Sequence, residues 1–423
     1  MNFLERTVHS VLLNFPRTKS MTVSLYQRIL SIYPVKNYCV NETMKVLPGY
    51  FFGFHDKCPW SGNGRMLLAH RFDREANIDI AEKQEIAIGL FADGKYEHFK
   101  ELSTSKAWNW QQGANLQWLG KSDRLIFNDI FKNKGVARIL DCEGRQLGTV
   151  PCHVVAVNGN GDLGATFSYE RLRHGSPPYS YAFGEAPHQD EPCPDSDGLC
   201  TVDLETMRIR QLFSLREISR VGWEPSMDNA YHYLSHCTFS PMEDRFAFIH
   251  EWRLPNGVSK TRLFTVGPDA KGLFLLPAAG VSHVAWRNPG HILAYCKPHG
   301  ERKGLYLFID RGGEYTPVGP DRIFDDGHPQ YSLDAGKVLM DAYPDRLRMQ
   351  RLFLFDCEKG VLEDLVRFRI PHFYREARRC DFHPRWNRDN SEVCFDSAHT
   401  GIRSLCILGL GRQTAPSRKN PAA

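Results

Sequence analysis

Four histidines stand at the same position in four similar segments of the second half of the chain. They are His236, His283, His328 and His383, and each precedes a Phe, Trp or Tyr by three residues. If successive segments are arranged around one axis, histidines at one register form a ring. Three or four imidazoles that converge on one point make a good site for Mn, Zn, Ni or Fe, with positions left open for a substrate. The spacing therefore predicts a metal or catalytic site.

The same register also has a structural interpretation, which the sequence leaves open. Each histidine would then hydrogen-bond a backbone group of the neighbouring repeat and hold the repeats together. Asp326 and Asp381 each stand two residues before one of the histidines. A carboxylate so placed is a candidate for orienting an imidazole ring that binds a metal.

Each segment continues into a short polar turn and a second apolar run that ends in polar residues. Imidazole and phenol groups there can act as base or acid, and guanidinium groups can bind a carboxylate. The candidate catalytic residues are His250, His399, Tyr343 and Arg253. The candidate substrate-binding arginines are Arg385 and Arg403.

A tryptophan-rich segment, WNWQQGANLQWL, offers a different kind of binding surface. Trp108 and Trp110 alternate with polar residues, which predicts that they share one face of a strand. Together with Gln112 they would form an edge that stacks on sugar rings and bonds their hydroxyls. Trp60 and Trp118 instead occupy the aromatic position of the repeat and are predicted to pack in the core.

The elements that must position these residues are β-strands. Helical periodicity is scarce after residue 45, whereas alternating apolar residues and Gly, Asp, Asn and Pro punctuation are frequent. The aromatic–turn–strand unit recurs seven times, at separations of roughly 40–60 residues with one longer gap, a period that suits a four-stranded propeller blade. We predict an all-β fold, a seven-bladed β-propeller of four-stranded antiparallel blades over residues 46–410. Residues 1–45 are predicted to be an N-terminal extension and residues 411–423 a disordered tail.

The repeat resembles the WSPDG unit of TolB-type propellers, and appears here as FSPMEDRFAF, YSLDAGKVLM and WNRDNSEVCF. That resemblance implies that the segment before each turn is the innermost strand, with the repeated histidines at one mouth of the central channel. Through FGFHDKCPW, WNWQQGANLQWL, DGHPQYS and RCDFHPRW, most of the chain also resembles uncharacterised propellers associated with bacterial surface-polysaccharide loci. The histidine-rich mouth is more distantly similar to oligogalacturonate lyase, a seven-bladed propeller with a divalent metal held mainly by histidines.

These resemblances imply recognition, and β-eliminative cleavage, of an acidic oligosaccharide at the mouth. Elimination requires that the carboxylate be neutralised, by a metal or an arginine, and that a base remove the adjacent proton. Hydrolysis would require two carboxylates beside the sugar instead; the candidates are Asp326, Asp345, Asp381 and Asp396. The main alternative is a non-catalytic propeller that binds glycans or scaffolds polysaccharide-biosynthesis proteins. A scaffold needs no converging titratable groups, whereas an enzyme does.

Composition narrows the classes of function. The chain is 42% hydrophobic, which argues for a large core, and its formal net charge of +4 gives no reason to expect a nucleic-acid partner. No stretch approaches the ~20 apolar residues of a membrane span. The first residues lack the features of a signal peptide, so a cytoplasmic location is expected. The 12 cysteines are predicted to be free thiols, with Cys193 and Cys200 the one pair close enough to suggest a disulfide or a metal.

Overall fold

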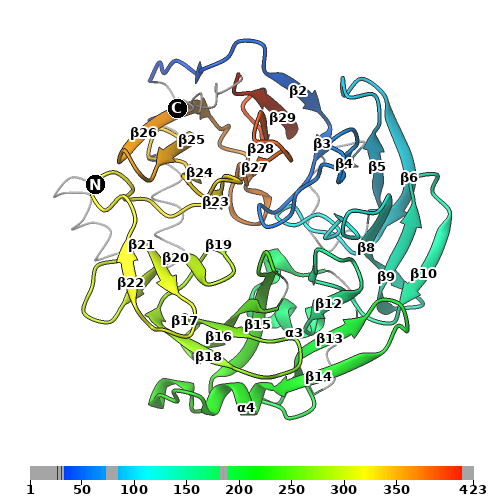
Figure 1. Cartoon of the computed structure of the whole chain (residues 1–423), viewed down its shortest axis with the longest axis vertical. Helices are drawn as coiled ribbons and strands as arrows, with labels where there is room; N and C mark the ends of the chain where they lie inside the picture. Colours follow the sequence, from blue (N-terminus) through cyan, green and yellow to red (C-terminus); the bar gives the residue numbers. More distant parts are fainter. Residues whose placement is uncertain are drawn as a thin grey trace, which may run out of the picture.

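The computed structural model describes residues 33–72, 84–181, 184, 188–242 and 244–411, together with Tyr26 and Leu30. Most of the predicted extension at residues 1–45 and all but the first residue of the predicted tail lie outside the described residues. Antiparallel sheets, most of them four-stranded, are arranged radially around a central axis, as Figure 1 shows. This arrangement is the predicted β-propeller.

The first three sheets follow the chain in order. The first contains β3 (Tyr50–Phe51), β4 (Leu67–Arg71), β5 (Ile86–Phe91) and β6 (Phe99–Ser105). The second contains β7 (Gln117–Trp118), β8 (Arg124–Phe131), β9 (Lys134–Asp141) and β10 (Gln146–Val150). The third contains β11 (Ala156–Val157), β12 (Leu163–Thr166), β13 (Gly198–Asp203) and β14 (Ile209–Ser214).

The next sheet has eight strands. Its first half contains β15 (Tyr231–Phe239), β16 (Phe246–Arg253), β17 (Ser259–Val266) and β18 (Phe274–Ala279). Its second half contains β19 (Val284–Asn288), β20 (His291–Pro298), β21 (Gly304–Ile309) and β22 (Tyr315–Pro317). Only a short pairing of β18 with β20 joins the halves. The predicted count of seven blades depends on dividing the sheet at this pairing.

The last two sheets combine both ends of the described chain. One contains β23 (Gln330–Tyr331), β24 (Lys337–Ala342), β25 (Met349–Asp356), β26 (Val361–Arg369) and, beside β26, β1 (Tyr38–Cys39). The other contains β27 (Arg385–Trp386), β28 (Glu392–Ser397), β29 (Ser404–Gly409) and, beside β29, β2 (Lys45–Pro48). The sheets therefore take in residues that precede the predicted boundary at residue 46.

The repeat has the predicted roles in all sheets but the first. The segment before the turn forms the first strand, at one edge, and the run after the turn forms the second strand, as in β15–β16 and β27–β28. In the first sheet β3 precedes the repeat, and Trp60 forms only an isolated bridge with Leu67. The edge strands β3, β19, β23 and β27 lie nearest the axis in Figure 1. Trp60 and Trp118 are 1% and 5% exposed, so the prediction that they pack in the core is confirmed.

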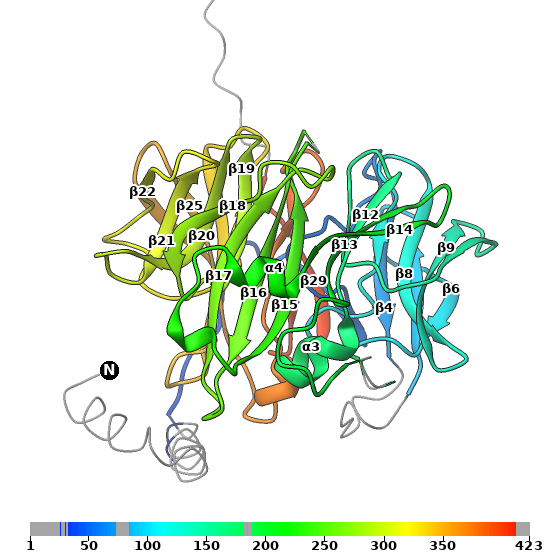
Figure 2. The same ribbon diagram turned by 90° about the horizontal axis from the view of Figure 1, so that it is seen from below.

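Short helices interrupt the strands at a few places. The long gap in the repeat, between β12 and β13, contains α3 (Tyr169–Gly175) and the 3-10 turn η2 (Pro177–Tyr179). The Ser168 hydroxyl caps α3 by accepting from the N–H of Arg171. The remaining short helices are α4 (Leu215–Arg220), η3 (Pro225–Met227) and η4 (Glu376–Arg378). Figure 2 shows α3 and the orange segment around η4 projecting on the same side of the propeller.

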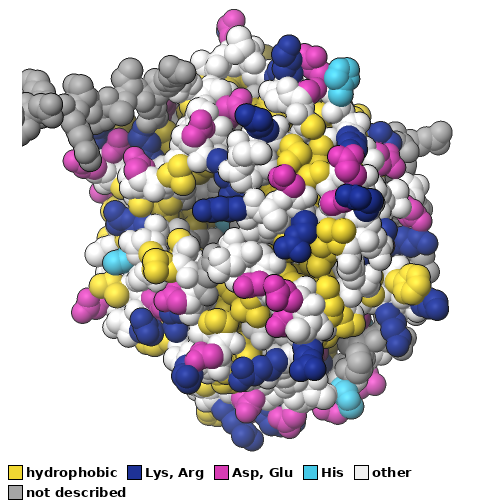
Figure 3. Space-filling model, turned by 45° about the vertical axis from the view of Figure 1, so that its right-hand side comes forward, with side chains coloured by type: hydrophobic (Ala, Val, Ile, Leu, Met, Phe, Trp, Pro, Cys, Tyr) yellow, Lys and Arg dark blue, Asp and Glu magenta, His cyan; other side chains and the backbone are white. Residues whose placement is uncertain are grey.

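The surface carries both signs of charge. Figure 3 shows basic and acidic side chains interspersed on the face in view, in keeping with the small net charge. In the part of the chain that the structure describes, no helix is long and apolar enough to cross a membrane. All 12 cysteines are free thiols, including Cys193 and Cys200.

Candidate metal centre

Three of the four repeated histidines gather beside the channel axis. His283, His328 and His383 stand one or two residues before the strands β19, β23 and β27, the edge strands nearest the axis. The ring centroid of His328 lies 4.1 Å from that of His283 and 4.2 Å from that of His383. The shared register thus brings these three imidazoles into contact, although their positions in the sequence are far apart.

A phenylalanine lies between these imidazoles and the fourth. Phe54 stacks on His236 at 4.8 Å, and its ring centroid lies 4.9 Å from that of His383 and 5.5 Å from that of His328. Gly53 lets the chain reach this position: its φ is +113°, and a Cβ there would stand 2.7 Å from the backbone of Gln112. His236 therefore packs against an aromatic ring that supplies no ligand atom.

One group of side chains is close enough to hold a metal ion. His328, His383 and Asp381 each offer a ligand atom, and these atoms lie within 4.8 Å of one another. In the described part of the chain, no other such group of three is found, and this group contains neither His236 nor His283. Asp381, which we expected to orient a ring, is thus placed as a potential ligand itself.

The two imidazoles of this group have unsatisfied nitrogen atoms. His328 and His383 are 0% and 1% exposed, and the Nε2 atom of each has no hydrogen-bond partner among the described residues. Burial holds the pKa of both imidazoles well below its usual value, so both rings are neutral near pH 7. Buried neutral imidazole nitrogens without partners, next to a carboxylate, fit the requirements of a divalent transition metal.

Asp341, in β24, fixes the geometry of both histidines. Its carboxylate accepts from the backbone N–H of His328 at 2.7 Å and from that of His383 at 3.1 Å. It also lies 2.9 Å from Nδ1 of His328. A proton on Nδ1 donated to Asp341 leaves the lone pair of Nε2 directed at the candidate site, as in carboxylate–histidine–metal arrangements. Burial raises the pKa of Asp341 to about 6, in spite of these hydrogen bonds.

Asp326 does orient an imidazole, but it is that of His283 in the preceding repeat and not that of His328, two residues further along the chain. Its Oδ1 lies 3.0 Å from Nδ1 of His283, and it also accepts from the hydroxyl of Ser282 at 2.9 Å. Burial, the largest single effect, would raise the pKa of Asp326, but the hydrogen bonds from His283 and Ser282 and the nearby charges of His283 and Lys303 together lower it. The ionised carboxylate therefore keeps the proton of His283 on Nδ1 and leaves Nε2 as an acceptor.

A tyrosine–arginine–tyrosine stack lies beside the candidate ligands. Arg379 donates through Nε to Asp381 and through its NH2 group to the hydroxyl of Tyr179. Its guanidinium lies over the rings of Tyr179 and Tyr343, at 5.7 and 5.5 Å. Tyr343, a predicted catalytic residue, lies 5.8 Å from the ring of His328. Burial raises the pKa of Tyr343, so its phenol stays protonated.

Sequence reasoning did not select three of these residues as site residues. Arg379 precedes a candidate ligand by two residues, which was a usable signal, whereas Tyr179 lies in the long gap between repeats. His55 was also missed: its ring lies 5.2 Å from that of His328, and its Nδ1 lies 3.1 Å from the carbonyl of Pro329. It stands in the FGFHDKCPW segment, five residues before an aromatic residue rather than three.

Three predicted catalytic residues lie apart from this group. His250 bonds to His232, 2.9 Å from Nε2 to Nδ1, and accepts from Nε of Arg262 at 2.9 Å, so it belongs to a buried structural network. His399 stacks on Phe368 at 3.9 Å. Arg253 ends β16, paired in the sheet with residues of β15 and β17. Of His250, His399, Tyr343 and Arg253, only Tyr343 lies against the grouped histidines.

The predicted substrate-binding residues are buried. Arg385 is 0% exposed and lies 3.2 Å from Asp396, and Arg403 is 2% exposed and stacks over Trp110 at 4.6 Å. Trp108, Trp110 and Gln112 are also buried, at 9%, 3% and 8% exposure. The expectation of an exposed sugar-stacking edge is therefore corrected: the segment turns inward, and its side chains pack in the core or bond within it.

The fold and this site define a β-propeller with buried histidines gathered beside its axis. Among solved structures, an oligogalacturonate lyase in complex with manganese is 14% identical, with a TM-score of 0.62 over 89% of this chain and 96% of that one. Oligogalacturonate lyase from Vibrio parahaemolyticus is 12% identical, with a TM-score of 0.60 over 89% and 97% of the two chains. These likenesses show the fold.

TolB from Acinetobacter baumannii is 11% identical over 82% of this chain and 81% of its own, but its TM-score of 0.39 is too low to support an argument. No known family profile matches the sequence. No curated protein matches it either.

Proposed function

We propose that this propeller binds a divalent transition metal through His328, His383 and Asp381 and uses it to bind and cleave an acidic oligosaccharide by β-elimination. The observation that carries the proposal is the pair of buried, neutral imidazoles whose Nε2 atoms lack partners and lie beside a carboxylate. A buried polar atom without a partner is costly, and a metal would satisfy both nitrogens at once.

The surroundings of the site suit an anionic substrate. A bound divalent metal supplies positive charge that polarises a substrate carboxylate. Arg379 adds a second, permanent positive charge beside Asp381, with its side chain 31% exposed. The likeness to a manganese-bound oligogalacturonate lyase supports this choice of substrate class. At 14% identity, this support comes from the shared fold alone.

The proton transfers of an elimination can be assigned to two side chains. His283, with its proton held on Nδ1 by Asp326, offers Nε2 as the base that removes the proton next to the substrate carboxylate. The bond from the neighbouring carbon to the glycosidic oxygen then breaks, a carbon–carbon double bond forms, and the leaving oxygen needs a proton. Tyr343, kept protonated by burial and 6.2 Å from His283 between ring centroids, is the donor.

The first test is the metal content of the purified full-length protein, measured by elemental mass spectrometry after reloading with Mn, Zn, Ni and Fe in turn. We expect near-stoichiometric metal in the parent protein and its loss in His328→Ala and in His383→Ala. His399→Ala is the matched control, because that histidine lies at another place in the same fold. Absence of metal from the reloaded parent, or full metal in both variants, would refute the metal site.

The second test is cleavage of uronate oligomers, followed by the ultraviolet absorbance of the new double bond. We expect a rise with the metal-loaded protein and no rise with Tyr343→Phe, although that variant keeps its metal. Stoichiometric metal in the parent without any absorbance rise would favour the alternative, a propeller that binds glycans and does not cleave them.

A further inference from the structure

A cavity lies between the second and third sheets, apart from the candidate metal centre. Its volume is about 730 Å³, within the range of small-molecule sites. One wall comes from the start of β9 and the loop between β10 and β11, and the other from the end of β12, α3 and the starts of β13 and β14. None of the candidate metal ligands lines it.

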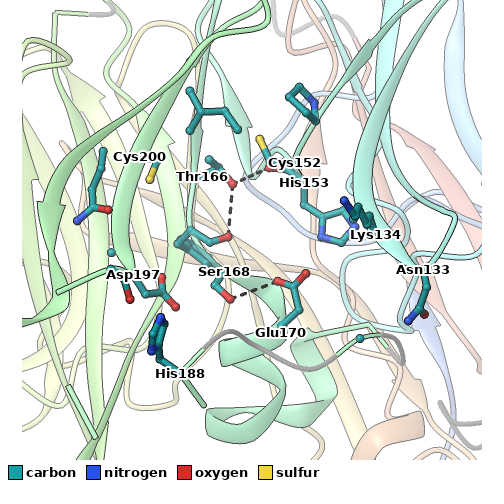
Figure 4. Close-up of a pocket in the computed structure, with 18 residues that line it drawn as sticks. Asn133, Lys134, Cys152, His153, Thr166, Ser168, Glu170, His188, Asp197 and Cys200 are labelled. Carbon is teal, nitrogen blue, oxygen red and sulfur yellow. Dashed lines mark hydrogen bonds between the residues drawn. The ribbon is translucent and has the colours of Figure 1, made fainter. Parts of the chain in front are cut away.

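Two carboxylates dominate one wall. Asp197 and Glu170 lie on either side of Ser168, as Figure 4 shows, and the hydroxyl of Ser168 donates to Glu170 at 3.2 Å. Neither carboxylate has an ion-pair partner within 4.0 Å among the residues described. Burial, with a smaller contribution from the nearby charge of Glu170, raises the pKa of Asp197 to about 6 against the opposing effects of Arg171 and the backbone N–H of Gly198. This wall is therefore poorly neutralised by the protein itself.

The rest of the lining is polar without being strongly charged. Lys134 and Asn133 stand on the other wall, away from Asp197 in Figure 4. Gln211, in β14, lies on the wall that the third sheet forms. Among the described residues of the lining, one lysine stands against two acids, which gives one net negative charge when histidine is counted as neutral. A ligand with one positive charge and several hydroxyls would match both the charge and the neutral donors and acceptors.

The thiols in the cavity are not arranged for chemistry. Burial raises the pKa of Cys152 to about 12 and that of Cys200 to about 11, so neither is an activated nucleophile. Over the described ranges, the only group of three or more side chains placed to hold a metal is the one at the channel mouth. The cavity is thus suited to binding rather than to catalysis or metal coordination.

We propose that this cavity is a binding site for an amino sugar, whose ammonium group lies against Asp197 and Glu170 and whose hydroxyls bond the neutral side chains of the lining. The proposal is independent of the metal centre, because it uses none of its residues. Charge-assisted hydrogen bonds from an ammonium to two partly desolvated carboxylates are among the stronger polar contacts available to a small ligand.

The test is calorimetric titration of the full-length protein with glucosamine, N-acetylglucosamine and glucose at pH 7.5. Glucosamine should bind at least about ten-fold more tightly than the other two, which lack the ammonium group, a difference typical of one charged hydrogen bond. Asp197→Asn and Glu170→Gln should each reduce that preference to near unity. Asp195→Asn, which removes an exposed acid paired with Arg216 nearby, is the matched control and should keep it.

Three outcomes would overturn the proposal. They are failure of glucosamine to bind, equal affinity for glucosamine and N-acetylglucosamine, and an equal loss of affinity in the Asp195→Asn control. Two separate variants protect the test against a folding defect in either one, and a thermal melt of each shows which variants are folded. The metal measurements do not affect this result, since His328→Ala should bind glucosamine as the parent does.

Discussion

At the scale of single residues, buried carboxylates determine what the histidines can do. Asp341 and Asp326 each accept a hydrogen bond from Nδ1 of one imidazole, so Nε2 of that imidazole can bind a metal or accept a proton. The repeated histidine is therefore only half of the functional unit. His236 lacks such a carboxylate, and its ring stacks on Phe54 instead.

Asp341→Asn should weaken metal binding by ten- to a hundred-fold, because without the carboxylate neither the tautomer nor the orientation of the His328 ring is fixed. Competition with a chelator of known affinity measures the effect. Asp396→Asn is the matched control: Asp396 also accepts two backbone N–H groups, from Phe52 and Gly53, but it touches no candidate ligand. An equal loss of affinity in both variants would mean that general loosening, not ligand orientation, is responsible.

The buried histidines also predict how stability depends on pH. Burial lowers the pKa of His70 to about 3, and its Nε2 accepts from the N–H of Ala114 at 3.0 Å. The unfolded chain, with an ordinary pKa near 6.5, binds the extra proton first. The free energy of unfolding should therefore be intact above about pH 6.5 and fall by about 1.4 kcal/mol per pH unit below it for this group.

Urea unfolding at pH 7 and pH 5 tests this prediction. His70→Gln should reduce the loss of stability between the two pH values, since it removes one titrating group, while His299→Gln on the surface should not. Asp341, whose raised pKa acts in the opposite direction, is present in both proteins. An unchanged pH dependence in His70→Gln would show that His70 is not the group responsible.

At the scale of elements, the second strand of one sheet bonds the start of the next sheet. His70 in β4 accepts from the N–H of Ala114, Asn128 in β8 from that of Val154, and Asp341 in β24 from that of His383. The sequence left open that the repeated histidines themselves serve this structural purpose. At these three places buried polar residues of the second strands do so instead.

Asn128→Ala tests this connection between sheets. Its side chain bonds the N–H of Val154 at 2.7 Å, the carbonyl of Val154 at 3.1 Å and the hydroxyl of Tyr181 at 3.0 Å. Because these groups would be left buried and unpaired, the variant should lose about 2–4 kcal/mol of unfolding free energy in urea. The exposed Gln146→Ala should lose much less, and a similar loss in both variants would contradict the assignment.

At the scale of the whole molecule, the ring is closed by strands from opposite ends of the described chain. β2 pairs with β29 from Lys45–Ile407 to Pro48–Ser404, and β1 pairs with β26. The closing sheet also carries Asp396, which bonds the segment that leads to Phe54. The sheet that closes the ring therefore also hydrogen-bonds the segment that leads to Phe54, beside the candidate metal centre.

Truncation separates the closing strands from the rest. A protein that begins at residue 49 lacks both β1 and β2, exposes the edge of β29 and should unfold at a much lower temperature or aggregate, since an unpaired edge strand invites association. A protein that begins at residue 37 keeps both strands and is the control. Differential scanning calorimetry compares them, and equal transition temperatures would mean that closure contributes little.

Much of the fold was predictable because its causes are local. The strand–turn–strand unit depends on alternating apolar residues and turn residues that are neighbours in sequence, and the aromatic position of Trp60 and Trp118 marked the core correctly. The same register placed three histidines together, since identical positions in radial repeats lie around one axis. Asp326 was selected because it stands two residues before His328, but its partner, His283, belongs to the preceding repeat.

What only the tertiary structure decided was which side chains meet across the channel. Phe54 packs among the repeated histidines although its segment is remote from theirs in sequence. Likewise, Arg379 donates to the hydroxyl of Tyr179 although 200 residues separate the two. Residue type alone suggested that Arg385 and Trp110 were exposed binding groups, yet packing between sheets buries both. Periodicity determines the face on which a side chain lies, whereas the partner it finds there depends on the closure of the ring.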